Sequence, residues 1–149
     1  MRPLSKLLAI VAMVPAPAFS HALDNQLTCG ETAHEFVTSL VDTQSIAVPA
    51  MRVEANSVNA FRPTSGAGLT AFGLRVHAVF GYQPDDPLFK AGDGNPAPGA
   101  VYGVVVLGSA DSVKRLLTGA GSTATVHSVI PMVLTAIVCR QTAGGESAE

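Results

Sequence analysis

The sequence has few charged residues and no tryptophan. Only 13% of its 149 residues are charged, against about 25% in an average domain, while 48% are hydrophobic. A chain of this composition buries enough apolar surface to offset the entropy of ordering, which excludes an intrinsically disordered protein. It also has too little Glu, Lys and Arg for a coiled coil. The length allows one domain.

Cysteine is also scarce, because the chain has only 2. This number excludes a disulfide-dense miniprotein, and the absence of a Cys-x-x-Cys motif excludes the common redox site. Cys29 and Cys139 lie near the two ends of the chain. An even count in an exported protein predicts one bridge, Cys29–Cys139, with two buried free thiols as the alternative.

No hydrophobic run is long enough to cross a membrane. The longest N-terminal run, Leu7–Val14, has eight residues, which is about 12 Å of helix against a hydrocarbon core of about 30 Å. It follows the basic residues Arg2 and Lys6, and small residues come after it. This pattern predicts a bacterial signal peptide over residues 1–22, cleaved after Ala22, with Ala18 as the lesser option. We therefore expect a periplasmic or secreted protein without a membrane span in its mature part.

Positive charge is sparse in the predicted mature chain. Once the two basic residues of the signal peptide are removed, seven basic residues remain against eleven acidic ones, a formal net charge of −4. This balance argues against a nucleic-acid partner, which requires a basic patch. The only tyrosines are Tyr82 and Tyr102, which gives little for base or sugar stacking. The expected partner is another envelope or secreted protein, no cofactor is indicated, and the oligomeric state stays open.

Two helices are predicted from caps and periodicity. The first spans 29–42, with a capping box formed by Thr28 and Glu31. The second begins after Ser109 as N-cap and ends at Gly119. From these helices and the strands we expect a core made of Phe36, Val37, Leu40, Val104, Val106, Leu116, Val126 and Ile137, with Val113 and Leu117 alongside Leu116.

The remaining segments are mostly β-formers. The expected elements are a strand over 46–54, a short helix over 56–61, a loop over 64–68, β-structure over 69–82 with a bulge at Gly73, a central strand over 101–107, and strands over 122–130 and 133–140. The sequence therefore predicts an α+β fold with a mostly antiparallel sheet of four to five strands and two or three helices. The domain spans 23–140, and 141–149 is a flexible tail.

A weak internal resemblance suggests one specific arrangement. Residues 55–58 resemble 110–113, and residues 66–71 resemble 119–124. Two β-α-β units of this kind would form a ferredoxin-like sheet. The alternative is coincidence among small residues.

The segment 83–99 has no periodicity. It contains seven Pro and Gly residues and is longer than most connections in a compact domain, which is typical of a functional loop or an insertion. Leu88 and Phe89 are its large apolar residues, and they either anchor a partner or fold back onto the core. The candidate partner-binding residues are Asp85, Asp86, Leu88, Phe89, Lys90 and Asp93.

Motifs for catalysis or metal binding are not found. His34 lacks the second histidine of a zinc helix, and the acidic residues of 83–99 do not have the spacing of a calcium loop. No nucleophile motif is present, so no catalytic residue or metal ligand is assigned. The sequence favours a small binding protein that acts through protein–protein contact, such as an inhibitor, an immunity-type protein or an assembly subunit. The alternative is a small periplasmic hydrolase or metal-binding protein that uses His77 or His127.

Overall fold

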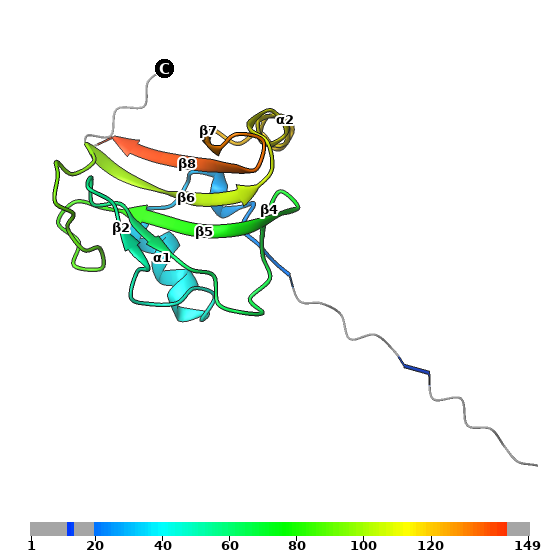
Figure 1. The fold of residues 1–149 in the computed structure, drawn as a ribbon, viewed down its shortest axis with the longest axis horizontal. Coiled ribbons are helices and arrows are strands. Elements are labelled where there is room, and N and C mark those ends of the chain that lie inside the picture. The colour runs from blue at the N-terminus through cyan, green and yellow to red at the C-terminus, as the bar shows by residue number, and fades with distance from the viewer. Residues whose placement is uncertain (1–11, 14–19, 143–149) are drawn as a thin grey trace, which may run out of the picture.

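The computed structural model describes residues 12–13 and 20–142, and these form an α+β fold around one sheet (Figure 1). The predicted α+β class is confirmed. The elements in chain order are β1 (His21–Ala22), the 3-10 helix η1 (Gln26–Thr28), α1 (Ala33–Asp42), β2 (Arg52–Val53), β3 (Asn59–Phe61), β4 (Leu69–Ala71), β5 (Leu74–Tyr82), β6 (Gly99–Leu107), α2 (Ala110–Ala120), β7 (Thr125–Ile130) and β8 (Leu134–Thr142). No helix among these residues is long and apolar enough to span a membrane.

The sheet is larger than predicted, with eight strands, and it is mixed. Its strand order is β1-β4-β5-β6-β8-β7. In addition, β3 pairs with the C-terminal half of β5, and β2 pairs with β3. The pair β1–β4 is parallel and the other pairs are antiparallel. As expected, the 101–107 strand is central, because β6 lies between β5 and β8. The additional strands have only two or three residues, which is too short to show a period of two in the sequence.

The core lies on the face of the sheet that α1 covers. Phe36, on the apolar stripe of α1, stacks against Tyr102 of β6 with ring centroids 4.7 Å apart. Of the predicted core, Phe36, Val37, Leu40, Val104, Val106 and Ile137 are buried, and Val126 is half-buried. Leu116 was wrongly placed, because it is 39% exposed. Val113 and Leu117, one turn apart on α2, face the core instead.

The first helix begins four residues later than predicted. Its capping box is Thr32 and Glu35: the Thr32 hydroxyl accepts a hydrogen bond from the Glu35 amide (3.1 Å), and the Glu35 carboxylate accepts one from the Thr32 amide (2.9 Å). The predicted box at Thr28 and Glu31 does not form. The Thr28 hydroxyl donates to the carbonyl of Asn25 and belongs to the 3-10 turn. Two Thr-x-x-Glu patterns lie four residues apart, and the second one is used.

Three other elements differ from prediction. The segment 46–54 forms a strand only at Arg52–Val53, and 59–61 is a strand rather than part of a helix. Because 55–58 is not helical whereas 110–113 begins α2, the chain does not contain two β-α-β units, and the ferredoxin-like arrangement is not adopted. Pairing with β5 decides the conformation of 59–61.

Glycines set two of the boundaries. Gly73 does not form a bulge; with Phe72 it makes the tight turn between β4 and β5, where both residues have positive φ, 50° and 79°. The irregularity in β5 lies between Val76 and Ala78. The second helix passes Gly119 and ends at Gly121, which has the left-handed conformation of a C-cap (φ 69°).

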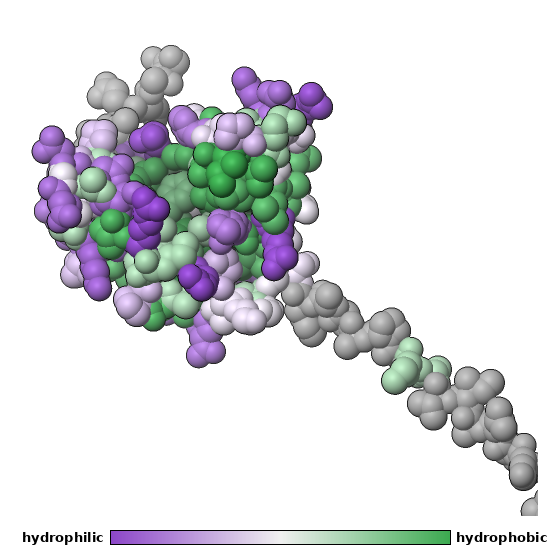
Figure 2. All heavy atoms as spheres, in the orientation of Figure 1, coloured by the Kyte–Doolittle hydropathy of each residue, from purple (hydrophilic) through white to green (hydrophobic). Residues whose placement is uncertain are grey.

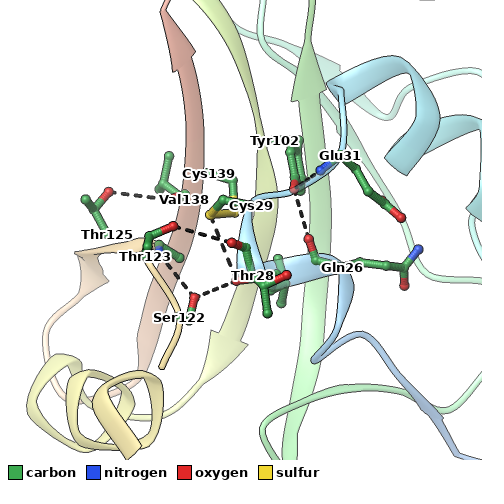
Figure 3. The surroundings of a disulfide bond; sticks show 12 residues. Gln26, Thr28, Cys29, Glu31, Tyr102, Ser122, Thr123, Thr125, Val138 and Cys139 are labelled. Carbon is green, nitrogen blue, oxygen red and sulfur yellow. Dashed lines mark hydrogen bonds between the residues drawn. A yellow bond between two sulfur atoms is a disulfide. The ribbon is translucent and has the colours of Figure 1, made fainter. Parts of the chain in front are cut away.

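The predicted Cys29–Cys139 disulfide is present (Figure 3). It joins the residue after η1 to β8. Nearby, the Tyr102 hydroxyl donates to the Gln26 carbonyl (2.9 Å) and accepts from the Glu31 amide (3.4 Å). The pKa of Tyr102 is raised, mainly because it is buried, so this hydroxyl stays protonated. The N-terminal segment is therefore attached to β6 and β8 by covalent and polar links.

The predicted domain, residues 23–140, begins directly after β1 and ends inside β8. The predicted cleavage bond after Ala22 is at the end of β1, whose neighbouring amides, on His21 and Leu23, donate to Gly68 and Thr70. Of the predicted signal peptide, residues 1–11 and 14–19 lie outside the described part of the chain. At the other end, β8 runs to Thr142, two residues past the expected domain end.

Candidate functional site

The connection between β5 and β6, residues 83–98, folds back onto the domain. Phe89 is only 7% exposed and belongs to the main core cluster. Its ring lies edge-on to Tyr82 with centroids 6.4 Å apart. Gly81 makes room for it, since a Cβ at that position would be 3.2 Å from the Phe89 ring. Of the two roles considered for Phe89, the structure shows the core contact. Leu88 is half-buried against the same core.

Two buried polar side chains hold the middle of this loop. The side-chain amide of Asn59 donates to the carbonyl of Lys90 (2.9 Å), and its oxygen accepts from the amide of Lys90 (3.0 Å). The Ser57 hydroxyl accepts from the amide of Gly92 (2.9 Å). Asn59 and Ser57 are 1% and 3% exposed. Because buried hydrogen bonds are costly to leave unmade, these contacts fix the loop in one position.

The far end of the loop lies against the turn that precedes β3. The amide of Gly94 donates to the Ala55 carbonyl and that of Ala97 to the Asn56 carbonyl, both at 2.9 Å. The backbone at Gly92 is so close that a Cβ there would lie 2.0 Å from the Glu54 carbonyl oxygen. Glycine is therefore required at position 92 for the loop to dock.

The beginning of the loop is joined to α1 through Asp86. One oxygen of its carboxylate accepts from the Leu88 amide (2.9 Å), and the other lies 2.6 Å from Nδ1 of His34. The His34 amide also donates to the side chain of Gln83 (3.2 Å). His34 thus ties the loop to the first turn of α1, which accounts for one of the three histidines considered in the sequence.

The loop and its supports enclose an open cleft of about 470 Å³. Asp85, Asp86, Tyr82 and Phe89 are among the residues that line it. Asp85, Lys90 and Asp93 are exposed, whereas the Asp86 side chain is 10% exposed. The structure therefore brings together the predicted site residues in one loop but divides them by role. Asp85, Lys90 and Asp93 face solvent, and the Asp86 carboxylate contacts His34. Phe89 packs against the core and supports the loop. The cleft is lined by Ser57, Tyr82, Gln83, Asp85, Asp86, Pro87, Phe89, Ala91, Gly92, Gly94 and Pro96.

The histidines of the alternative hypothesis do not meet. His77 is on β5 and His127 is on β7, and β6 and β8 lie between these strands. Three strand spacings separate such positions by about 14 Å. Within residues 12–13 and 20–142, no group of three or more His, Cys, Asp or Glu residues is arranged to hold a metal ion.

The supports of the loop were not found from the sequence. Ser57 and Asn59 lie in the segment expected to be a short helix, and their partners are 31 to 35 residues away. The only sequence signal for them is that both are small polar residues next to apolar ones, which is too common to be informative.

Comparisons with known proteins give no relative for this chain. No family model matches it, and neither a curated protein nor a solved structure matches it.

Proposed function

We propose that this is a small binding protein that acts through protein–protein contact, with the 83–98 loop as its contact surface. The observation that carries the proposal is the anchoring of the loop by Asn59, Ser57 and His34 around an open cleft. A loop held in one conformation loses little entropy on binding, which favours affinity. Binding residues are also concentrated on loops that a rigid scaffold positions.

The chemistry of the surface follows from its exposed residues. The exposed Asp85 and Asp93 give the loop surface negative charge, and Lys90 is an exposed basic residue on it. Asp86 is already in contact with His34. Tyr82 adds an aromatic wall. A partner that places a basic side chain in this cleft would gain both charge complementarity and aromatic contact. In this proposal Phe89, which is 7% exposed, mainly positions the loop, and it also lines the cleft.

We further propose that the protein acts in the periplasm or outside the cell, where its partner is another envelope or secreted protein. The predicted signal peptide supports this location. The disulfide supports it as well, because such bonds persist in oxidising compartments. Inhibitors, immunity-type proteins and assembly subunits are the classes that this description fits.

The experiment is a comparison of two charge reversals in a pull-down from the native envelope fraction. Asp85→Lys changes a residue that lines the cleft, and Asp111→Lys changes another exposed carboxylate, on α2. We expect a protein that is retained by the wild type and by Asp111→Lys but not by Asp85→Lys. If every retained protein binds both variants equally, the loop is not the contact surface.

A further inference from the structure

Strand β7 is an open edge of the sheet. Within the described part of the chain it pairs only with β8, and five of its six residues are exposed while Val126 is half-buried. An edge strand of this length presents a row of unpaired N–H and C=O groups that can template another strand. The other two described edges are short. β1 has two residues, and β4, which becomes the edge after the predicted cleavage of residues 1–22, has three. β2 has two residues and carries Arg52, paired with Glu54 at 2.8 Å.

Strand β7 lies in a long segment of sequence without charged residues, although Lys114 of α2 lines a cavity together with Thr125 and Val126. From Leu116 to Cys139 the sequence contains no Asp, Glu, Lys or Arg. Proteins commonly place such charges on edge strands to prevent pairing. The bulge between Ser128 and Ile130 breaks the pairing with β8 near the end of the strand, but Thr125–Ser128 pairs regularly. Thr125–Ser128 is therefore a four-residue edge segment that has neither a charged residue nor a bulge.

An apolar patch continues from this edge over the adjoining face of the sheet. Leu134 lies directly opposite both Leu107 and Ile130 in the strand register, so the three side chains share one face. Leu107 and Ile130 are exposed, and so are Met132 and Val133 in the turn that follows β7. Figure 2 shows this patch as the strongly apolar area where β6 ends and β8 begins. Exposed apolar groups that cluster in this way mark interaction sites.

We propose that β7 pairs antiparallel with β7 of a second copy of this chain, so that the two sheets become one. The argument for a second copy is electrostatic. A two-fold axis places the strand opposite itself, so any charged residue in it would face its own like charge or that of a neighbour. β7 has no charged residue, and the sequence segment 116–139 that contains it has none. A partner chosen by opposite charge would require charges on this strand. This inference does not depend on the 83–98 loop, which connects β5 to β6.

The test is the oligomeric state of the disulfide-bonded protein, measured by sedimentation equilibrium over a wide concentration range. We expect a reversible dimer in the wild type. His127→Lys and Ser128→Lys each place a charge on β7 opposite its copy, and each should weaken dimerisation by about tenfold or more. Ser65→Lys adds the same charge to an exposed position in the loop between β3 and β4, on the other side of the sheet from β7, and should leave dimerisation unchanged.

Two measurements make the outcome decisive. The melting temperature of the dissociated variants should match that of the dissociated wild type, which shows that the Lys residues act on pairing and not on folding. Amide hydrogen exchange in Thr125–Ser128 should slow as the protein concentration rises. A wild type that stays monomeric, or a dimer that is insensitive to both β7 substitutions, would overturn the proposal.

Discussion

The side chain of Asn59 pairs with the main chain of Lys90 through two hydrogen bonds, 2.9 and 3.0 Å long. It therefore substitutes for a neighbouring strand at a point where the loop has none. Asn59 is itself the first residue of β3, which pairs with β5. The same residue thus belongs to the sheet and fixes the loop, which explains how a segment rich in Pro and Gly keeps a defined shape.

Replacing this side chain should release the loop. Asn59→Ala leaves the partly buried N–H and C=O groups of Lys90 without their side-chain partner, and we expect it to lower the free energy of unfolding by about 1–3 kcal/mol. Asn95→Ala, at an exposed position in the same loop, should change it by less than about 0.5 kcal/mol. Urea unfolding of the two variants measures both values. Equal stability of the two variants would show that the Asn59–Lys90 contact does not hold the loop.

Phe89 should behave as a core residue. Because it is 7% exposed, Phe89→Ala should destabilise the free protein by about 3–5 kcal/mol. A thermal melt of the purified variant is sufficient to measure the effect. If the variant folds as stably as the wild type but no longer binds a partner, Phe89 is a partner-contacting residue and not a core residue.

Neighbouring leucines on α2 test the register of that helix. Leu117 is 3% exposed and Leu116 is 39% exposed. Leu117→Ala should cost about 2–5 kcal/mol of unfolding free energy, whereas Leu116→Ala should cost less than about 1 kcal/mol. Chemical denaturation of the matched pair gives both numbers. The opposite order would support the register that the sequence predicted.

Glu31 should make stability depend on pH. Its Oε2 atom is buried without a hydrogen-bond partner among the described residues, and its pKa is raised above the usual 4.5 by burial and then by the charge of Glu35. The native state therefore binds the proton more tightly than the unfolded state does. This contribution to stability is fully present below about pH 4.5, and it is lost as the pH rises through the raised pKa.

The variant Glu31→Gln removes this charge. At pH 7 it should melt at a higher temperature than the wild type, and the difference should shrink as the pH is lowered toward 4. Glu54→Gln, at a more exposed carboxyl, serves as the control and should not show this pattern. Melting curves recorded across this range measure the effect. A Glu31→Gln protein that is less stable than the wild type at pH 7 would contradict the assignment.

The features that could be predicted from the sequence are those encoded locally. The apolar run predicted β6, and the residues at the start of α2 predicted its Ser109 cap. The disulfide could be predicted because the chain has only two cysteines to pair. The short strands could not be predicted, because 59–61 becomes a strand only through pairing with β5. Leu116 and Leu117 are adjacent, so periodicity alone did not decide which of them faces the core.

For the candidate site, the sequence identified the loop but not what holds it. Seven Pro and Gly residues exclude regular structure, and that inference is local. The contacts of Asn59, Ser57 and His34 with the loop span 31 to 52 residues. They depend on how β3 and α1 are placed by the rest of the fold, which no local pattern encodes.

The most direct test of the account is amide hydrogen exchange in the 83–98 loop of the free protein. We expect the amides of Lys90, Gly92, Gly94 and Ala97 to be protected, because each donates to a group outside the loop. Asn59→Ala should remove the protection of Lys90 while the amides of β6 stay protected. Exchange of all four loop amides at the rate of an unfolded chain in the wild type would contradict the claim that this loop is a pre-formed binding surface.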